Sequence, residues 1–133
     1  LANTRNYGWP ISSYGFHYNP TYNEEYGDIA PLHKSHEEYG FAEPIIYFDY
    51  ETNGSHGIST LIPNYFDSDD SYFITTLNGI RLYSLTIENM QVKSNKTYFL
   101  NERTRDIVYD EQRNVYYLIF EDTPSFGILR DNG

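Results

Sequence analysis

Two arginines spaced two residues apart, Arg103 and Arg105, are the first residues in this sequence that suggest chemistry. They stand at the start of an extended run, and side chains two apart in a strand lie on one face of the sheet. A guanidinium group is always charged and presents its N–H groups as a fork that matches carboxylate oxygens. Because the chain is acidic, the pair needs an explanation, and an exposed ion pair with Glu102 or Asp106 is one.

Two other polar clusters suggest metal binding less well. His33 and His36 are three residues apart and are followed by two glutamates, but no further ligand cluster follows, so a solvated loop is the better interpretation. Asp67, Asp69 and Asp70 have the composition of a calcium loop but lack its glycine and its final glutamate. We therefore expect a hairpin turn there, and we predict no metal site in the chain.

The composition favours a small β-rich domain. The 133 residues include 15 Tyr and 8 Phe, and aromatic residues are enriched in strands. The net charge is −10, so the basic surface typical of nucleic-acid binding is absent and DNA or RNA partners are not expected. No apolar run is long enough to cross a membrane as a helix.

The pattern of the chain predicts strands after a loop-rich start. Residues 1–42 lack periodicity, and Pro44–Tyr50 is a first strand candidate. Four short strands are expected between Gly57 and Leu100, with Asn78-Gly79 as a tight turn. Three more are expected, at Asp106–Tyr109, Val115–Phe120 and Phe126–Arg130.

Four strands followed by three suit an all-β fold of the propeller type, whose blades are four-stranded antiparallel sheets. We expect a loop-rich lead-in at 1–42, a blade at 43–100 and an incomplete last blade at 101–133. In a closed propeller the missing strand would come from the other end of the chain, so we expect these residues to be part of a larger ring. A small closed β-barrel or a sandwich is the competing architecture.

Three motifs in order carry a resemblance to a known family. They are Asn-Tyr-Gly-Trp-Pro at 6–10, Tyr-Phe-Ile-Thr-Thr-Leu-Asn-Gly at 72–79 followed by Leu82, and Glu-Arg-Thr-Arg-Asp-Ile at 102–107 followed by Val-Tyr-Tyr-Leu at 115–118. Together they resemble the C-terminal part of the glucose/sorbosone dehydrogenase family. The resemblance implies a soluble aldose sugar dehydrogenase that depends on pyrroloquinoline quinone (PQQ) and folds as a six-bladed β-propeller, of which this chain would form about two to three blades.

The resemblance assigns the two arginines to the cofactor. PQQ is strongly anionic, and the Arg-x-Arg pair of the family contacts it, which maps onto Arg103 and Arg105. A third cofactor position maps onto Asn78, where the family usually has Lys or Arg. Asn donates a hydrogen bond but supplies no charge, and a charge-assisted bond is roughly twice as strong as a neutral one. Arg81 is the nearby cation that would compensate.

Aromatic residues complete the implied site. Tyr47 and Phe48 resemble the family position where aromatic rings lie near the sugar and the cofactor, with ordinary core packing as the alternative. Trp9 resembles a structural residue of the family, which implies a packing role. The family's catalytic His and its calcium ligands precede the Gly-Trp-Pro motif, so the resemblance implies no catalytic residue within this chain.

The sequence thus predicts part of a PQQ-dependent enzyme that oxidises an aldose at C1, with hydride transfer to the quinone. The expected partners are a sugar substrate and the remaining propeller blades, with calcium bound in the intact protein and a periplasmic or secreted location. Two alternatives stay open: a non-catalytic propeller relative that binds carbohydrate or a protein partner, and a small acidic all-β interaction module.

Overall fold

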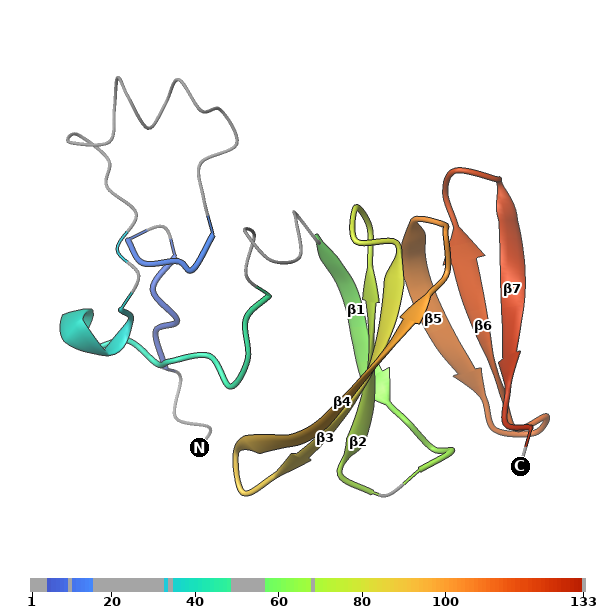
Figure 1. Ribbon diagram of the computed structural model, residues 1–133, viewed down its shortest axis with the longest axis horizontal. Coiled ribbons are helices and arrows are strands. Elements are labelled where there is room, and N and C mark those ends of the chain that lie inside the picture. Colours follow the sequence, from blue (N-terminus) through green and yellow to red (C-terminus); the bar gives the residue numbers. More distant parts are fainter. Residues whose placement is uncertain are drawn as a thin grey trace. The chain divides into compact units, whose positions relative to one another are not determined.

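The computed structural model describes residues 5–9, 11–15, 33, 35–48, 57–67 and 69–132 (Figure 1). The chain divides into two compact units, Leu1–Thr52 and Asn53–Gly133. The first unit contains one short 3-10 helix, η1 (Glu37–Tyr39), among its described residues. The second unit contains the strands, and each unit is described by itself below.

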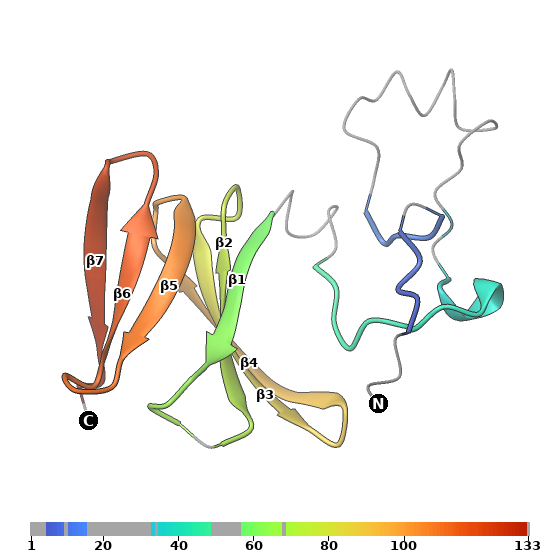
Figure 2. The same cartoon turned by 180° about the vertical axis from the view of Figure 1, so that it is seen from behind.

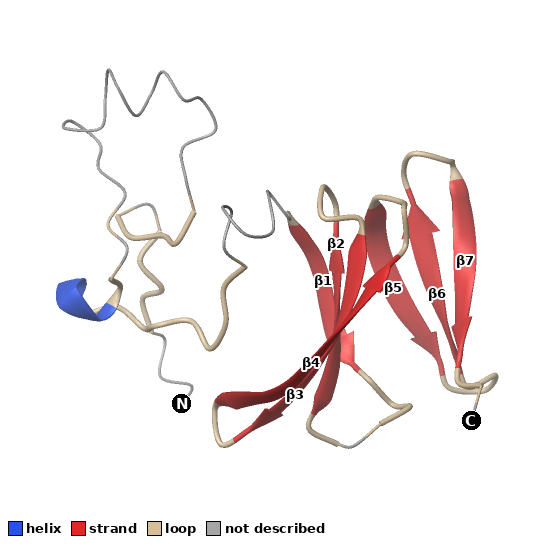
Figure 3. Cartoon of the chain, viewed as in Figure 1, coloured by secondary structure: helices blue, strands red, loops and turns tan. Residues whose placement is uncertain are grey.

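The second unit is built from two antiparallel sheets (Figure 3). The first sheet has the order β1-β2-β3-β4, and its strands are β1 (Ile58–Pro63), β2 (Ser71–Thr76), β3 (Arg81–Glu88) and β4 (Gln91–Phe99). The second sheet has the order β5-β6-β7, and its strands are β5 (Thr104–Asp110), β6 (Val115–Phe120) and β7 (Ser125–Arg130). Strands adjacent in sequence are therefore adjacent in space, as in the blades of a propeller.

The expected run of four strands and then three is confirmed, but one strand candidate was wrong. Residues 44–48 are not in a strand, while positions 49 and 50 lie outside the described residues. The segment makes another contact instead, since the ring of Tyr47 stacks on that of Tyr14. Pro44 has no N–H to give to a sheet, so this segment is a weak strand former despite its apolar residues.

The core lies between the two sheets and centres on Tyr116. Its ring makes edge-to-face contacts with Phe66 and Phe73, with centroids 5.0 and 5.1 Å away. Its hydroxyl donates to the carbonyl of Pro63 at 2.6 Å and accepts from the N–H of Tyr65 at 2.7 Å. Burial raises the pKa of Tyr116. This one side chain of β6 therefore fixes the end of β1 through both packing and hydrogen bonds. The other buried residues of the hydrophobic core, besides Tyr116 and Phe73, are Leu82, Ile107 and Leu118.

Alternation of the antiparallel strands brings several loops to one end of the unit, which is the upper end in Figure 1. The turn after β2, the link between β4 and β5, and the turn after β6 all lie there. The expected tight turn at Asn78-Gly79 is confirmed, since the N–H of Ile80 donates to the carbonyl of Leu77. The first strands of the two sheets, β1 and β5, lie side by side in both views (Figures 1 and 2).

Candidate functional site

Arg103 and Arg105 lie at this loop-bearing end, on either side of the buried residue Thr104. The register of β5 with β6 shifts between Thr104, which pairs with Phe120, and Asp106. Arg105 is the extra residue at this irregularity, and a bulge of this kind re-aims the side chain that it carries. The two arginines reach the same carboxylate. Arg103 precedes β5 and Arg105 is the extra residue of the irregularity, so the strand alternation expected from their spacing is not what brings them together.

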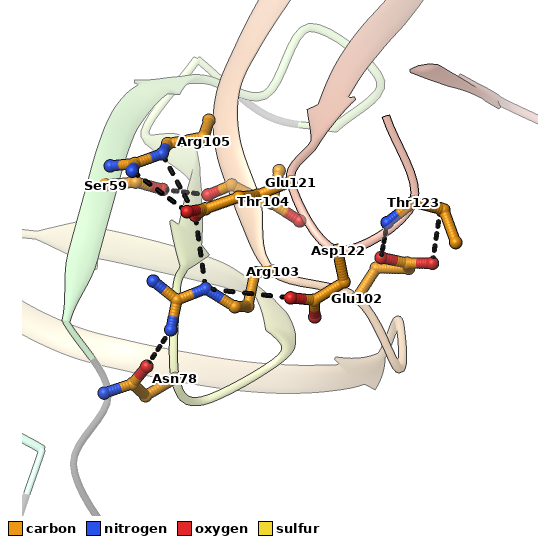
Figure 4. Close-up of polar contacts among 9 residues, drawn as sticks. All are labelled: Ser59, Asn78, Glu102, Arg103, Thr104, Arg105, Glu121, Asp122 and Thr123. Atoms are coloured by element: carbon orange, nitrogen blue, oxygen red, sulfur yellow. Dashed lines mark hydrogen bonds and ion pairs between the residues drawn. The ribbon is translucent and has the colours of Figure 1, made fainter. Parts of the chain in front are cut away.

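That carboxylate belongs to Glu121, in the turn between β6 and β7 (Figure 4). Its Oε2 lies 3.2 Å from Nε of Arg103 and 3.0 Å from Nε of Arg105. Its Oε1 accepts a hydrogen bond from Nη2 of Arg105 at 3.1 Å. The hydrogen bond from Arg103 is the main reason that the pKa of Glu121 is lowered.

The ion-pair partners expected from the sequence were wrong. Glu102 instead accepts from the hydroxyl of Thr123 at 2.6 Å. Asp106 accepts from the hydroxyl of Thr60 at 2.9 Å and from the N–H of Ile107 at 2.8 Å. Sequence reasoning missed Glu121, and the only available signal was that the turn after β6 must return to the end of the sheet where the arginines lie.

Asn78 belongs to the same cluster. Nη1 of Arg103 donates a hydrogen bond to Oδ1 of Asn78, which lies in the turn between β2 and β3 (Figure 4). Asp122 lies at the edge of ion-pair range, with its Oδ1 4.0 Å from Nε of Arg103. The structure thus brings together all three predicted cofactor positions. The two arginines, Glu121 and Asp122 balance in formal charge, so the cluster is less cationic than the sequence pair alone suggests.

Hydroxyl groups hold the backbone beneath the arginines. The hydroxyl of Ser59 donates to the carbonyl of Thr104 at 2.6 Å and lies 2.7 Å from Oγ1 of Thr75. These contacts join β1 and β2 to the start of β5. Oγ1 of Thr104 itself is buried and has no hydrogen-bond partner in the described part of the protein. The hydrogen bonds of Ser59 hold the backbone at Thr104 against the first sheet, so the cluster is supported by fixed strands, as a binding site requires.

Arg81 does not take the place of a cation at position 78. Its Nη1 donates to the carbonyl of Gly79 at 3.0 Å, and its guanidinium carbon lies 4.8 Å from the centroid of the Phe99 ring. A cation over an aromatic face is a stabilising arrangement in its own right. These contacts hold the guanidinium between the turn and β4, so the compensation suggested by the sequence has no support in the structure.

The predicted substrate residues lie in the first unit. The ring of Tyr47 stacks on Tyr14 with centroids 4.0 Å apart, and the hydroxyl of Tyr14 donates to Glu43 at 2.8 Å. This hydrogen bond is the main reason that the pKa of Tyr14 is raised. Phe48 is half-buried. The substrate role of Tyr47 and Phe48 stays a prediction, because no contact in the described residues tests it.

The packing role expected for Trp9 stays a prediction. The residue is 77% exposed, so the described residues of its own unit leave most of it uncovered. The neighbouring Gly8 is the more constrained residue, with φ of 92°. A Cβ at this position would lie 2.1 Å from the hydroxyl oxygen of Ser12, so only glycine fits.

Ser12 and His36 form a buried pair that resembles a nucleophile and its base. The Oγ of Ser12 lies 2.8 Å from Nδ1 of His36, which also lies 3.2 Å from the carbonyl oxygen of Tyr7. A carbonyl oxygen only accepts, so a hydrogen bond to Tyr7 requires the tautomer with the proton on Nδ1. In that tautomer Nδ1 cannot take a proton from the serine, and the pair is a structural contact rather than an activated nucleophile.

Two further features bear on function. Within the described ranges, no group of three or more His, Asp or Glu side chains is placed so that it could hold a metal ion. In the same ranges, no helix has the length and apolar character needed to span a membrane.

The sheets define part of an all-β propeller, and comparison with known proteins identifies the family. The model of the family described as Glucose / Sorbosone dehydrogenase matches residues 1–129, so the chain belongs to that family. The resemblance carried by the three motifs is thereby confirmed. No curated protein gives a significant match.

Two solved structures share the fold. One, titled "Crystal structure of glucose dehydrogenase", superimposes with a TM-score of 0.66 at 23% identity and covers 97% of this chain and 36% of that chain. Another, titled "glucose dehydrogenase", gives a TM-score of 0.65 at 23% identity over 97% of this chain and 34% of its own length. The chain thus spans about a third of the length of the structures it matches, and the expected partial propeller fold is confirmed.

Proposed function

We propose that this chain is part of a sugar dehydrogenase that oxidises an aldose at C1 with PQQ as the hydride acceptor. The observation that carries the proposal is the cluster of Arg103, Arg105 and Asn78 at one end of two adjacent blades. Membership of the glucose/sorbosone dehydrogenase family supports the reaction class.

The residues of the cluster fit an anionic quinone. Each guanidinium has five N–H donors. In the described part of the protein, Arg105 donates through Nη2 and makes an ion-pair contact through Nε, which leaves Nη1 without a protein partner. Arg103 uses donors on Nε and Nη1, which leaves Nη2 in the same condition. These remaining N–H groups suit carboxylate and quinone oxygens.

The proposed division of labour follows from these contacts. When bound, PQQ supplies the acceptor for the hydride that leaves C1 of the sugar. Arg103 and Arg105 bind and orient the anion, and Asn78 orients Arg103. Tyr47 and Phe48 are proposed as the apolar wall beside the sugar. The base that takes the hydroxyl proton, and calcium, are proposed to belong to parts of the protein outside these 133 residues, together with the remaining blades.

The proposal is tested with the intact protein that contains this chain, supplied with calcium and PQQ. We expect dye reduction with aldoses and its loss in Arg105→Ala. The matched control is Arg113→Ala, because Arg113 is also exposed and ion-paired, with Asp110, but lies in the turn between β5 and β6. An intact protein that neither binds PQQ nor reduces dye would rule out the enzyme, and turnover by the 133 residues alone would contradict the assignment of the base.

A second candidate function is favoured by the charge balance of the cluster. Two carboxylates, Glu121 and Asp122, oppose the two arginines, and position 78 adds no charge. Such a site would suit a neutral ligand, as in a non-catalytic relative that binds carbohydrate. Titration with sugars in the absence of PQQ separates the two functions. For the enzyme, a periplasmic or secreted location is proposed, and fractionation of the producing cells tests it.

A further inference from the structure

Glu121 is the one residue in the described part of the cluster that contacts both arginines. Arg105 approaches it side-on through two nitrogens, at 3.0 Å from Nε to Oε2 and 3.1 Å from Nη2 to Oε1. Arg103 reaches the same Oε2 through Nε at 3.2 Å. The backbone also holds Glu121 in place, because its N–H donates to the carbonyl of Arg103 at 2.9 Å.

These contacts restrict how each guanidinium can turn. The side-on approach to the carboxylate restricts the orientation of Arg105 as well as its position, because one hydrogen bond from Nη2 and one ion-pair contact from Nε reach the two carboxylate oxygens together. The two cations would otherwise repel each other and separate, since the side chain of Arg105 is 57% exposed and has room to move. With the Nε edges of both arginines turned toward Glu121, their outer nitrogens are the ones left for a ligand.

We propose that Glu121 is a positioning residue that holds Arg103 and Arg105 as an aligned pair, so that both present N–H groups to one anionic ligand. The inference rests on the proposed function, because the ligand in question is the quinone. Glu121 acts through the arginines and does not itself touch the cofactor.

A different role for the same carboxylate gives opposite expectations. If Glu121 only neutralises charge, its removal leaves the site more cationic, and an anion binds more tightly. If Glu121 positions the pair, its removal lets the guanidinium groups separate, and the anion binds more weakly. Glu121→Gln keeps the size of the side chain and removes the charge, so the direction of the change in affinity decides between the two.

The first measurement is the dissociation constant of PQQ for the intact protein, followed by optical titration. We expect Glu121→Gln to weaken binding on the order of tenfold, since one aligned charge-assisted contact is worth about that much. The matched control is Asp122→Asn, which removes the same charge from the next residue. Asp122 has a single contact with Arg103, at 4.0 Å, so its variant should bind within about twofold of the parent or more tightly.

A second variant keeps the negative charge of residue 121 and shortens its side chain. Glu121→Asp retains the carboxylate but shortens the side chain by one methylene, so it cannot contact both arginines as in the parent. The positioning role predicts that Glu121→Asp weakens PQQ binding as Glu121→Gln does, whereas a pure charge effect predicts binding like the parent. Tighter or unchanged binding in both variants would overturn the proposal.

A readout without ligand separates failure of this inference from failure of the proposed function. The Nε–H signals of arginine in NMR spectra report whether each guanidinium is held. We expect the signals of Arg103 and Arg105 to be protected from exchange in the parent and in Asp122→Asn, and to be lost in Glu121→Gln. If the parent shows protected signals but binds no PQQ, the proposed function fails. If the parent binds PQQ while the signals are equally protected in Glu121→Gln, the positioning role fails.

Discussion

The amide oxygen of Asn78 accepts a hydrogen bond from Nη1 of Arg103, and this contact joins the β2–β3 turn of one sheet to the start of the next sheet. Asn78 thus orients a cation instead of being one. The family resemblance places Lys or Arg at this position, so the chain has one positive charge fewer than expected around the proposed cofactor. Because the charges of the cluster otherwise balance, the missing positive charge at position 78 should affect how tightly an anionic cofactor binds.

We expect Asn78→Lys to increase the affinity of the intact protein for PQQ several-fold. The substitution adds a positive charge beside a cluster whose charges otherwise balance, and attraction between exposed charges is strongest at low ionic strength. The measurement is the dissociation constant at about 10 mM and about 150 mM salt. The gain should shrink at the higher salt concentration.

Asn78→Ala is the matched control for that experiment, because it removes the acceptor for Arg103 without adding charge. Its affinity for PQQ should fall, by an amount that corresponds to the loss of one exposed hydrogen bond, about 0.5–1.5 kcal/mol. If Asn78→Lys and Asn78→Ala behaved alike at low salt, the missing charge would not limit binding at this site.

Acid should weaken the folded protein through Glu121. The hydrogen bond from Arg103 and the charges of both arginines lower the folded-state pKa of Glu121 below its ordinary value of 4.5. The ion pairs therefore stabilise the fold fully above pH 4.5, and this stabilisation is lost as the pH falls through the lowered pKa. We expect the difference in Tm between the parent and Glu121→Gln to be constant near neutral pH and to diminish in acid. Glu111→Gln, a change in an exposed turn, should give a small difference with no such trend.

The hydroxyl of Tyr116 should contribute strongly to stability. In Tyr116→Phe the carbonyl of Pro63 and the N–H of Tyr65 both lose the hydroxyl that they bond to, and both hydrogen bonds are part-buried. A hydrogen bond of this kind contributes about 0.5–1.5 kcal/mol, so we expect the loss of both to lower the free energy of unfolding measured with urea by about 1–3 kcal/mol. Tyr117→Phe, on the other face of β6, should change it by less than about 0.5 kcal/mol. Equal losses in the two variants would contradict this role.

The sequence predicted those parts of the fold whose signals are local. The strand Val115–Phe120 and the turn at Asn78-Gly79 were placed correctly, because apolar alternation and turn residues are encoded by neighbours. The last of the four short strands expected before Leu100 is longer than expected, since β4 has nine residues and begins at Gln91. Most of β4 faces solvent, so its polar residues carry no alternation.

The candidate site shows the same limit. The spacing of Arg103 and Arg105 is enough to single out the pair, but their shared partner Glu121 is 16 to 18 residues away in sequence. That contact depends on the register of β5 with β6 and on the irregularity at Arg105, neither of which is encoded by a local pattern. Asn78 was reached only through the family resemblance, because its contact with Arg103 crosses between the two sheets.

The last prediction concerns Thr104, the buried residue between the two arginines. Oγ1 of Thr104 is fully buried and has no hydrogen-bond partner in the described part of the protein, which is an unfavourable state for a polar group. Thr104→Val keeps the shape of the side chain and removes this hydroxyl. We therefore expect the free energy of unfolding to rise by about 1 kcal/mol.

Thr75→Val is the control, because Thr75 is equally buried but hydrogen-bonded. The hydroxyl of Ser59 donates to the carbonyl of Thr104, so the contact between Ser59 and Thr75 has Thr75 as its donor. Its removal should lower the free energy of unfolding by about 1 kcal/mol. Urea unfolding of both variants in the intact protein measures the difference. A loss of stability in Thr104→Val as large as that in Thr75→Val would show that the Thr104 hydroxyl is bonded in the intact protein.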